Sequence, residues 1–306
     1  MTCLALTVRT LLDVAMRHKG SPVTVRQSVR LQSRGSTRRR AAMLALALCL
    51  SPFPALADEA WDAVRDQLYP GQDLRDGTRM IAVEAPYRTP DDARTRIAAM
   101  VHAPTGQRLG KVTLVLDNNP MPVSAVFALS APQQSFFFDV TMRVNGPTPL
   151  HVIAETTDGQ LWVSESYVKT SGQGACSAPP GTDPALALAT LGEMQLDVAE
   201  LLPTGPAGQL RALSGRHRRL DVEISHPSHS GMQMNQISLL YIPMRYVSDV
   251  GIALDGAGYV EMTGSISLSE NPRVGLSIPG RTRSVDVTMT DTSGTTTTAH
   301  KDLAGF

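Results

Sequence analysis

Alternation of apolar and polar residues in short runs is the feature that most constrains the fold of this chain. Between residues 136 and 144 every second side chain is apolar, and the same period of two recurs at 112–116 and 285–290. Successive side chains of a β-strand point to opposite faces, so this period predicts strands with one buried face. Asp158-Gly159 and Ser293-Gly294 lie between extended runs and predict hairpin turns.

Short strands joined by tight turns are typical of β-sandwiches and barrels. Helical patterning is scarce, with one short candidate at 61–68 and a weaker one at 184–194. We therefore expect an all-β protein.

Two domains are expected from the length of the chain and from a break in its composition. The 306 residues are enough for two domains of about 100–150 residues each. Residues 170–181 contain almost no apolar side chains to bury and are rich in Gly, Ser and Pro. We place a first domain at 58–171, a connector at 172–205 and a second domain at 206–306.

The amino terminus, residues 1–57, is predicted to be a leader with a secretory signal peptide. The basic triplet at 38–40 precedes an apolar run at 41–50, and Ala55-Leu56-Ala57 follows as a cleavage site. The apolar run is too short to span a bilayer as a permanent helix. We expect a mature chain that begins near Asp58, lies outside the cytoplasm and has no membrane span.

The charge of the chain is unevenly distributed. Residues 1–40 hold nine of the 28 basic residues and one of the 28 acidic residues, so the remainder carries a net negative charge. An acidic body lacks the basic surface that nucleic acid binding requires. We therefore expect no nucleic-acid partner.

Cysteine usage singles out one thiol. Cys3 and Cys49 lie in the predicted leader, so the mature chain keeps only Cys176. A single unpaired cysteine in an exported protein indicates a reactive thiol or an intermolecular disulfide.

Cys176 lies in the connector, where Gly172, Gly174 and Gly181 would make the chain flexible. No histidine is close to it in the sequence to lower its pKa, which describes a carrier arm better than an enzyme active site. The alternative is an incidental small residue in a loop. From composition we expect the thiol to be accessible and Cys176→Ser to leave stability nearly unchanged.

Two sets of short motifs follow one another along the chain. Those of the first half are Leu68-Tyr69-Pro70-Gly71, Ala85-Pro86, Leu116-Asp117-Asn118-Asn119-Pro120-Met121-Pro122, Ala154-Glu155-Thr156-Thr157-Asp158-Gly159 and Tyr167-Val168-Lys169. Those of the second half are Ile224-Ser225-His226-Pro227, Tyr241-Ile242-Pro243, Ser269-Glu270-Asn271-Pro272 and Asp291-Thr292-Ser293-Gly294. With the first set, residues 68–181 resemble the sulfur carrier subunit SoxY of sulfur oxidation. With the second set, residues from about 220 to the end resemble its partner SoxZ.

The chain thus resembles a SoxYZ fusion, with the quinoprotein dehydrogenase-associated SoxYZ-like carriers as the most similar group. The resemblance implies two immunoglobulin-like β-sandwiches in tandem, packed together in the periplasm. Because the connector holds the two domains at a high effective concentration, we expect an intramolecular pair and a monomer. It implies no enzymatic activity and no cofactor. It also implies partners among periplasmic enzymes, such as a quinoprotein dehydrogenase or a c-type cytochrome.

In SoxY the substrate is held on a cysteine within a Gly-Gly-Cys-Gly-Gly arm at the carboxyl terminus, and only Cys176 matches that role here. The segment Gly174-Ala175-Cys176-Ser177-Ala178-Pro179-Pro180 has fewer glycines and a stiff exit. It is also tethered at both ends, because a second domain follows.

A second group of residues is a weaker candidate for a functional site, one that would bind copper(I). His226, His229, Met232 and Met234 lie within nine residues, and imidazole and thioether are ligands that suit this ion. Methionines at such positions more often pack in a core.

Two hypotheses about function remain open. In the first, the protein carries a sulfur-containing or other thiol-reactive group covalently on Cys176. In the second, it is a non-covalent accessory module for a quinoprotein dehydrogenase or its electron acceptor.

Overall fold

The computed structural model describes residues 56–172, 174–200 and 217–303, all within the unit Ala55–Phe306. The predicted leader, residues 1–57, lies almost entirely outside this range. The helices are α2 (Leu56–Leu68), the 3-10 turn η2 (Ala175–Ser177) and α3 (Pro184–Ala189). None of the described helices is long and apolar enough to cross a membrane.

Fifteen strands make up most of the described chain, so the all-β expectation is confirmed. The strands of the first half are β1 (Leu74–Asp76), β2 (Ile81–Glu84), β3 (Thr95–His102), β4 (Leu109–Leu116), β5 (Val123–Gln133), β6 (Ser135–Met142), β7 (Thr148–Thr156) and β8 (Leu161–Val168). Those of the second half are β9 (Met194–Glu200), β10 (His217–Ile224), β11 (Val247–Leu254), β12 (Ala257–Gly264), β13 (Arg273–Pro279), β14 (Ser284–Asp291) and β15 (Thr296–Asp302).

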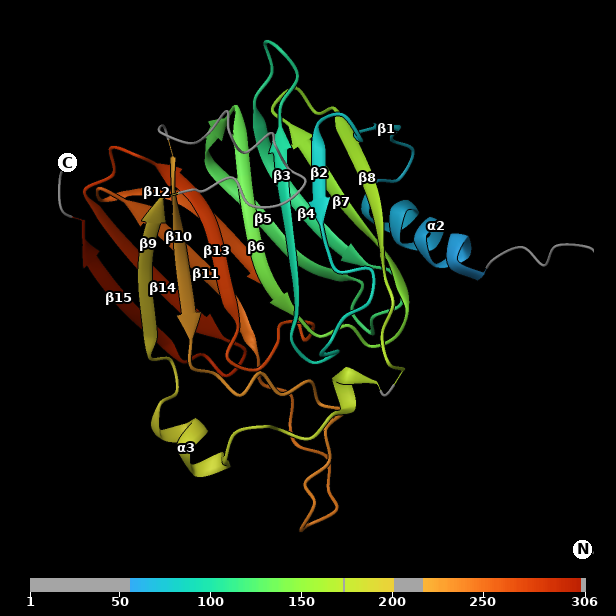
Figure 1. The fold of residues 1–306 in the computed structure, drawn as a ribbon, viewed down its shortest axis with the longest axis vertical. Helices are drawn as coiled ribbons and strands as arrows, with labels where there is room; N and C mark the ends of the chain where they lie inside the picture. Colours follow the sequence, from blue (N-terminus) through green and yellow to red (C-terminus); the bar gives the residue numbers. More distant parts are fainter. Residues whose placement is uncertain (1–55, 173, 201–216, 304–306) are drawn as a thin grey trace, which may run out of the picture. The chain divides into compact units, whose positions relative to one another are not determined.

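The strands form two sheets that face each other (Figure 1). The nine-stranded sheet has the order β1-β8-β7-β4-β5-β12-β11-β14-β15, and the six-stranded sheet has the order β2-β3-β6-β13-β10-β9. Both sheets therefore run through both halves of the chain. The halves join through the antiparallel pairs β5–β12 and β6–β13.

One continuous hydrophobic core lies between the sheets and crosses this seam. Phe127 of β5 stacks on Phe138 of β6, with ring centroids 4.8 Å apart. Met262 and Leu276, on the strands that pair with β5 and β6, belong to the same core. The two halves of the chain, which we call the first and the second module, are thus joined by shared sheets as well as by packed apolar side chains.

An ionic network covers the outer face of the six-stranded sheet at the seam. The buried Asp139 of β6 accepts from Arg96 Nε at 2.7 Å and from Arg219 Nη2 at 2.6 Å. Asp221 of β10 contacts Arg219 and Arg273, each at 2.9 Å. Because Arg96 and Arg219 belong to different halves, Asp139 ties the halves together.

The local predictions from sequence agree with these elements. Asp158-Gly159 joins β7 to β8, and Ser293-Gly294 joins β14 to β15. Gly159 and Gly294 both have φ of +82°, a conformation that glycine adopts without steric cost. The helical candidate at 61–68 lies within α2, and that at 184–194 begins with α3.

The interval 172–205, expected to be a connector, contains three elements of its own. These are η2, α3 and β9, of which β9 pairs with β10 along its whole length. The side chain of Asp183 accepts from the amides of Ala185 and Leu186 and caps α3. Among the described residues of this interval, those with no sheet partner lie between the end of β8 and the start of β9.

Candidate functional site

The segment after β8 carries Cys176 to one end of the sandwich. There residues 174–178 form a turn that we call the Cys176 turn. The carboxylate of Asp92 accepts from the Ser171 amide at 3.0 Å before the turn begins. Gly174, which precedes η2, then adopts φ of +76°, a left-handed conformation that glycine adopts without steric cost. The side chain of Cys176 is completely buried.

Polar side chains of both modules hold the backbone of the Cys176 turn. Asn145 of the first module accepts from the Cys176 amide at 3.1 Å. From the second module, the Ser230 hydroxyl donates to the Cys176 carbonyl, and Gln233 Nε2 donates to the Ala178 carbonyl at 3.1 Å. The turn is thus a further place where the two modules meet.

Glu270 holds the exit from the turn. Its carboxylate accepts from the amides of Gly181 and Thr182, both at 2.8 Å. Gly181, chosen from the sequence as a source of flexibility, is therefore hydrogen-bonded in this state, as are the residues around Gly174. The prediction of an accessible thiol is wrong for this structure, because side chains distant in sequence close over a segment that has few apolar groups of its own.

A buried asparagine organises the floor of the site. Asn119, from one of the SoxY-like motifs, donates to the Arg143 carbonyl at 2.8 Å and to Ser267 Oγ at 2.9 Å. Its own Oδ1 accepts from the Asn145 amide at 2.9 Å. The motif therefore positions Asn145, which in turn binds the Cys176 amide.

The electrostatics of the site keep the thiol protonated in the closed state. Burial raises the pKa of Cys176 to about 11, and the nearby Arg143 guanidinium lowers it only in part. Arg143 is itself buried, and burial lowers its pKa. Its Nη1 donates to the carbonyls of Ser228 at 2.7 Å and Leu268 at 2.5 Å. Since the thiolate is the nucleophilic form, the closed thiol is unreactive at neutral pH.

Sequence reasoning found Cys176 but missed the side chains that surround it. Asn145, Ser230, Gln233 and Arg143 lie 31 or more residues from Cys176. Two signals were available in the sequence, because Glu270 and Asn119 each lie in one of the motifs described above. The role of Asn119 in supporting Asn145 becomes visible only when the two modules are folded together.

Of the four copper candidates, the imidazoles of His226 and His229 have polar partners within the protein. His226 Nδ1 accepts from the Ser228 amide at 2.9 Å, and its Nε2 lies 3.4 Å from Asp291 Oδ2. His229 Nδ1 lies 3.1 Å from Gln233 Oε1. Met232 and Met234 follow in the same loop. The described residues contain no group of three or more His, Cys, Asp or Glu suited to a metal.

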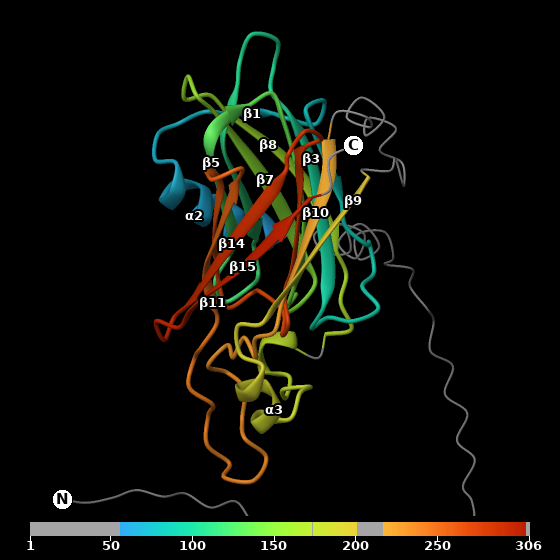
Figure 2. The same ribbon diagram turned by 90° about the vertical axis from the view of Figure 1, so that its left-hand side faces the viewer.

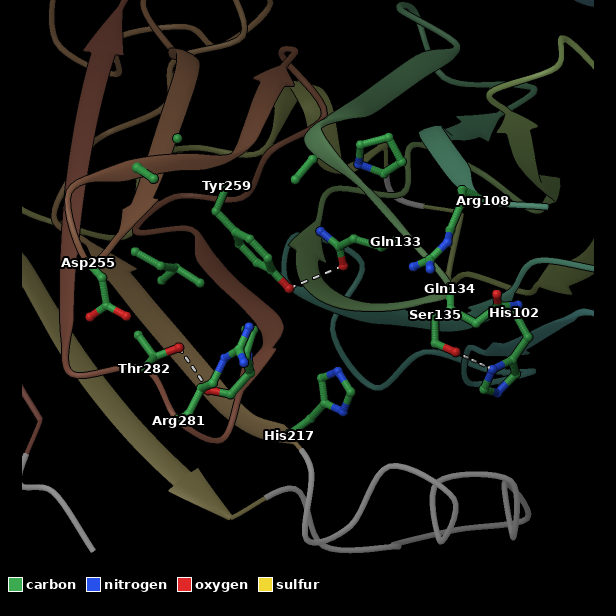
Figure 3. A pocket seen from close by; sticks show the side chains of 16 residues that line it. His102, Arg108, Gln133, Gln134, Ser135, His217, Asp255, Tyr259, Arg281 and Thr282 are labelled. Atoms are coloured by element: carbon green, nitrogen blue, oxygen red, sulfur yellow. Dashed lines mark hydrogen bonds between the residues drawn. The ribbon is translucent and has the colours of Figure 1, made fainter. Parts of the chain in front are cut away.

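A separate cavity of about 700 Å³ lies beside His217, the first residue of β10, and is lined by residues of both modules (Figure 3). Tyr259 donates to Gln133 Oε1 at 3.1 Å within it. His102 and Ser135 form a second polar pair, with 2.7 Å between Nδ1 and Oγ. Cys176 does not line this cavity, so the cavity is not part of the thiol site.

Comparisons with known proteins agree with the division of the chain into two modules. A family model described as "Sulfur oxidation protein SoxY" matches residues 65–176, ending at the cysteine itself. A model described as "Sulphur oxidation protein SoxZ" matches residues 209–302. A search of curated protein sequences gives no match.

One solved structure similar to this chain is that of the sulfur carrier protein SoxY from Chlorobium limicola f thiosulfatophilum. The identity is 18%, and the alignment covers 37% of this chain and 98% of that chain, with a TM-score of 0.33.

Proposed function

Because the chain is a SoxY module fused to a SoxZ module, and both belong to families of sulfur-oxidation carrier proteins, we propose that it is a periplasmic carrier that holds a sulfur-containing group covalently on Cys176. The observation that carries this proposal is the position of Cys176. It is the last residue of the SoxY match and the one free cysteine of the described residues. Side chains of both modules also bind its turn.

The proposed loading step is a thiol exchange that needs no external oxidant. Once the turn opens, the Cys176 thiolate attacks the outer sulfur of a group held by a partner enzyme through an S–S bond. A new S–S bond to Cys176 forms, the partner's S–S bond breaks, and the partner's thiolate leaves. The proton of Cys176 passes to a base on the partner or to water. Unloading is the reverse exchange with a second enzyme.

The partners that we propose are periplasmic enzymes in a pathway linked to a quinoprotein dehydrogenase, or to the cytochrome that accepts its electrons. This link is supported by the resemblance of the chain to SoxYZ-like carriers that are associated with quinoprotein dehydrogenases. In this role the protein presents its cargo and performs no catalysis of its own.

A second candidate is a non-covalent accessory module for the same partners. The observation that favours it is the complete burial of the Cys176 side chain, which prevents thiol chemistry in the closed state. In that case the surfaces of the two sandwiches would bind the partner, and Cys176 would only fill its site.

Intact-mass spectrometry of protein purified from its native periplasm tests the carrier. We expect a mass increase that disappears on reduction and is absent from Cys176→Ala. Alanine is the suitable replacement because serine would place a hydroxyl in the buried site. If Cys176→Ala retained full activity in the source cell with an unchanged melting temperature, the covalent carrier would be excluded and the accessory module favoured.

A further inference from the structure

A projecting hairpin near the Cys176 turn exposes a cluster of large apolar side chains. We call residues 234–244 the apolar hairpin; it extends away from the sheets at the end where α3 lies (Figures 1 and 2). Ile237 at its tip is 94% exposed. The other exposed members of the cluster are Met234, Leu239, Leu240, Tyr241 and Met244. The sequence contains no charged residue from 230 to 244.

The apolar hairpin is an ordered structure with its own hydrogen bonds. Met234 and Tyr241 form an antiparallel bridge, and the Asn235 amide donates to the Leu240 carbonyl at 2.9 Å. Asn235 Oδ1 accepts from the amides of Ile237 and Ser238, each at 2.9 Å. These bonds hold the apolar side chains in solvent, where they contribute nothing to the core. A contiguous exposed apolar cluster of this kind is typical of an interaction site.

Backbone conformation at the tip also favours a role in binding. Leu239 has φ of +57°, a left-handed conformation that costs an L-residue about 1–2 kcal/mol. Glycine would adopt it at no steric cost. A leucine that occupies such a position while exposed is better explained by contact with a partner than by folding.

The stem of the apolar hairpin is bonded directly to the Cys176 turn. Ser230 and Gln233 precede the hairpin, and their side chains donate to the carbonyls of Cys176 and Ala178. Gln233 also accepts the Ile242 amide through its own carbonyl at 2.8 Å, which joins the two sides of the stem. A displacement of the hairpin therefore acts on the bonds that close the turn.

We propose that the apolar hairpin is the docking element for the enzyme that exchanges sulfur with Cys176, and that docking draws the stem away and uncovers the thiol. This inference rests on the proposed carrier function. A buried thiol has to be uncovered by the protein that reacts with it, and the hairpin is the exposed structure attached to its turn. The occupant is an enzyme with an apolar groove beside its sulfur-exchanging site.

The absence of charge in the sequence of the hairpin favours this occupant over a membrane. Segments that bind bilayer surfaces combine an apolar side with lysine or arginine, which are attracted to anionic lipids. Residues 230–244 include neither. An apolar groove on a protein requires no such charges.

Photo-crosslinking in the source cell tests the proposal, with a benzophenone amino acid at position 237 in the full-length chain. A parallel sample traps the protein that forms a mixed disulfide with Cys176. We expect the same enzyme in both samples. A benzophenone at position 87 is the control, because Tyr87 is 70% exposed and lies in the first module. Cross-links from position 237 to lipid, to a second copy of this chain, to another protein or to nothing would each overturn the proposal.

A double variant, Ile237→Ser with Leu240→Ser, separates docking from folding. We expect an unchanged melting temperature and an unchanged rate of thiol labelling, but at least tenfold less cargo on Cys176 in cells. Tyr87→Ser should load normally. Normal loading of the double variant would refute the docking role. If Cys176 carried no cargo even in the unaltered protein, the carrier function itself would fail, whatever the hairpin cross-links.

Discussion

Replacing Ser230 by alanine should loosen the Cys176 turn without unfolding the protein. The Ser230 hydroxyl donates to the Cys176 carbonyl and accepts from the Met232 amide at 3.2 Å. Its removal leaves buried backbone groups without these partners, at a cost of about 1–2 kcal/mol to the closed turn. Because 1.4 kcal/mol changes an equilibrium tenfold, the population with an exposed thiol should rise about 5- to 30-fold.

The rate of maleimide labelling at pH 8, followed by intact mass, reports this population. The closed thiol contributes little, since its pKa of about 11 leaves about a hundredfold less thiolate than an ordinary thiol with a pKa of 9. We therefore expect slow labelling of the wild type and labelling of Ser230→Ala that is about 5- to 30-fold faster. Ser248→Ala is the matched control, because Ser248 donates to the Thr290 carbonyl at 3.1 Å, far along the chain from the turn.

Two results would refute this reasoning. The first is labelling of the folded wild type as fast as that of the chain unfolded in urea, which would mean that the turn is not closed in solution. The second is an equal acceleration in Ser248→Ala, which would show that labelling follows global unfolding.

Three further predictions concern the folded state. Burial lowers the pKa of His226 to about 4, so the folded protein binds fewer protons there than the unfolded chain. The urea-unfolding free energy should therefore fall by up to about 3 kcal/mol between pH 6.5 and 4, with a shallower dependence in His226→Gln. Asp139→Asn removes a charge shared by Arg96 and Arg219, and calorimetry should show a loss of about 2 kcal/mol. Light scattering under reducing conditions should give a monomer.

The sequence predicted individual strands better than it predicted their neighbours. A period of two at 136–144 shows which side chains face the core, and β6 buries Phe136, Phe138 and Val140 as expected. The period carries no information about which strand lies alongside. On one side, Val140 pairs with Val274, and 134 residues separate the two. No local sequence pattern therefore predicts the seam, because its strand pairs form only when the two modules fold together.

The prediction of a flexible segment with an accessible Cys176 was the main error of sequence reasoning. Gly, Ser and Pro indicate mobility because they bring few apolar groups to bury. Here the segment is held through its backbone instead, by the side chains of Asn145, Ser230, Gln233 and Glu270. Small residues permit this arrangement, since their backbone lies close to the surface that binds it. Composition alone does not distinguish a mobile segment from a docked one.

In a carrier whose cysteine segment is tethered at both ends, loading requires the closed Cys176 turn to open as well as the segment to reach the partner. Cys176 lies eight residues after Val168, the last residue of β8, so a freed segment could carry the thiol about 28 Å from that strand at full extension. Tethering to β8 therefore limits the reach of the thiol to about this length. The three hydrogen bonds to Cys176 and Ala178, at about 1 kcal/mol each, would by themselves leave about one molecule in 150 open. A partner that bound both states equally would not change this fraction. Loading therefore depends on a partner that binds the open state more tightly, and bonds between the turn and the stem of the apolar hairpin provide a physical route to that preference.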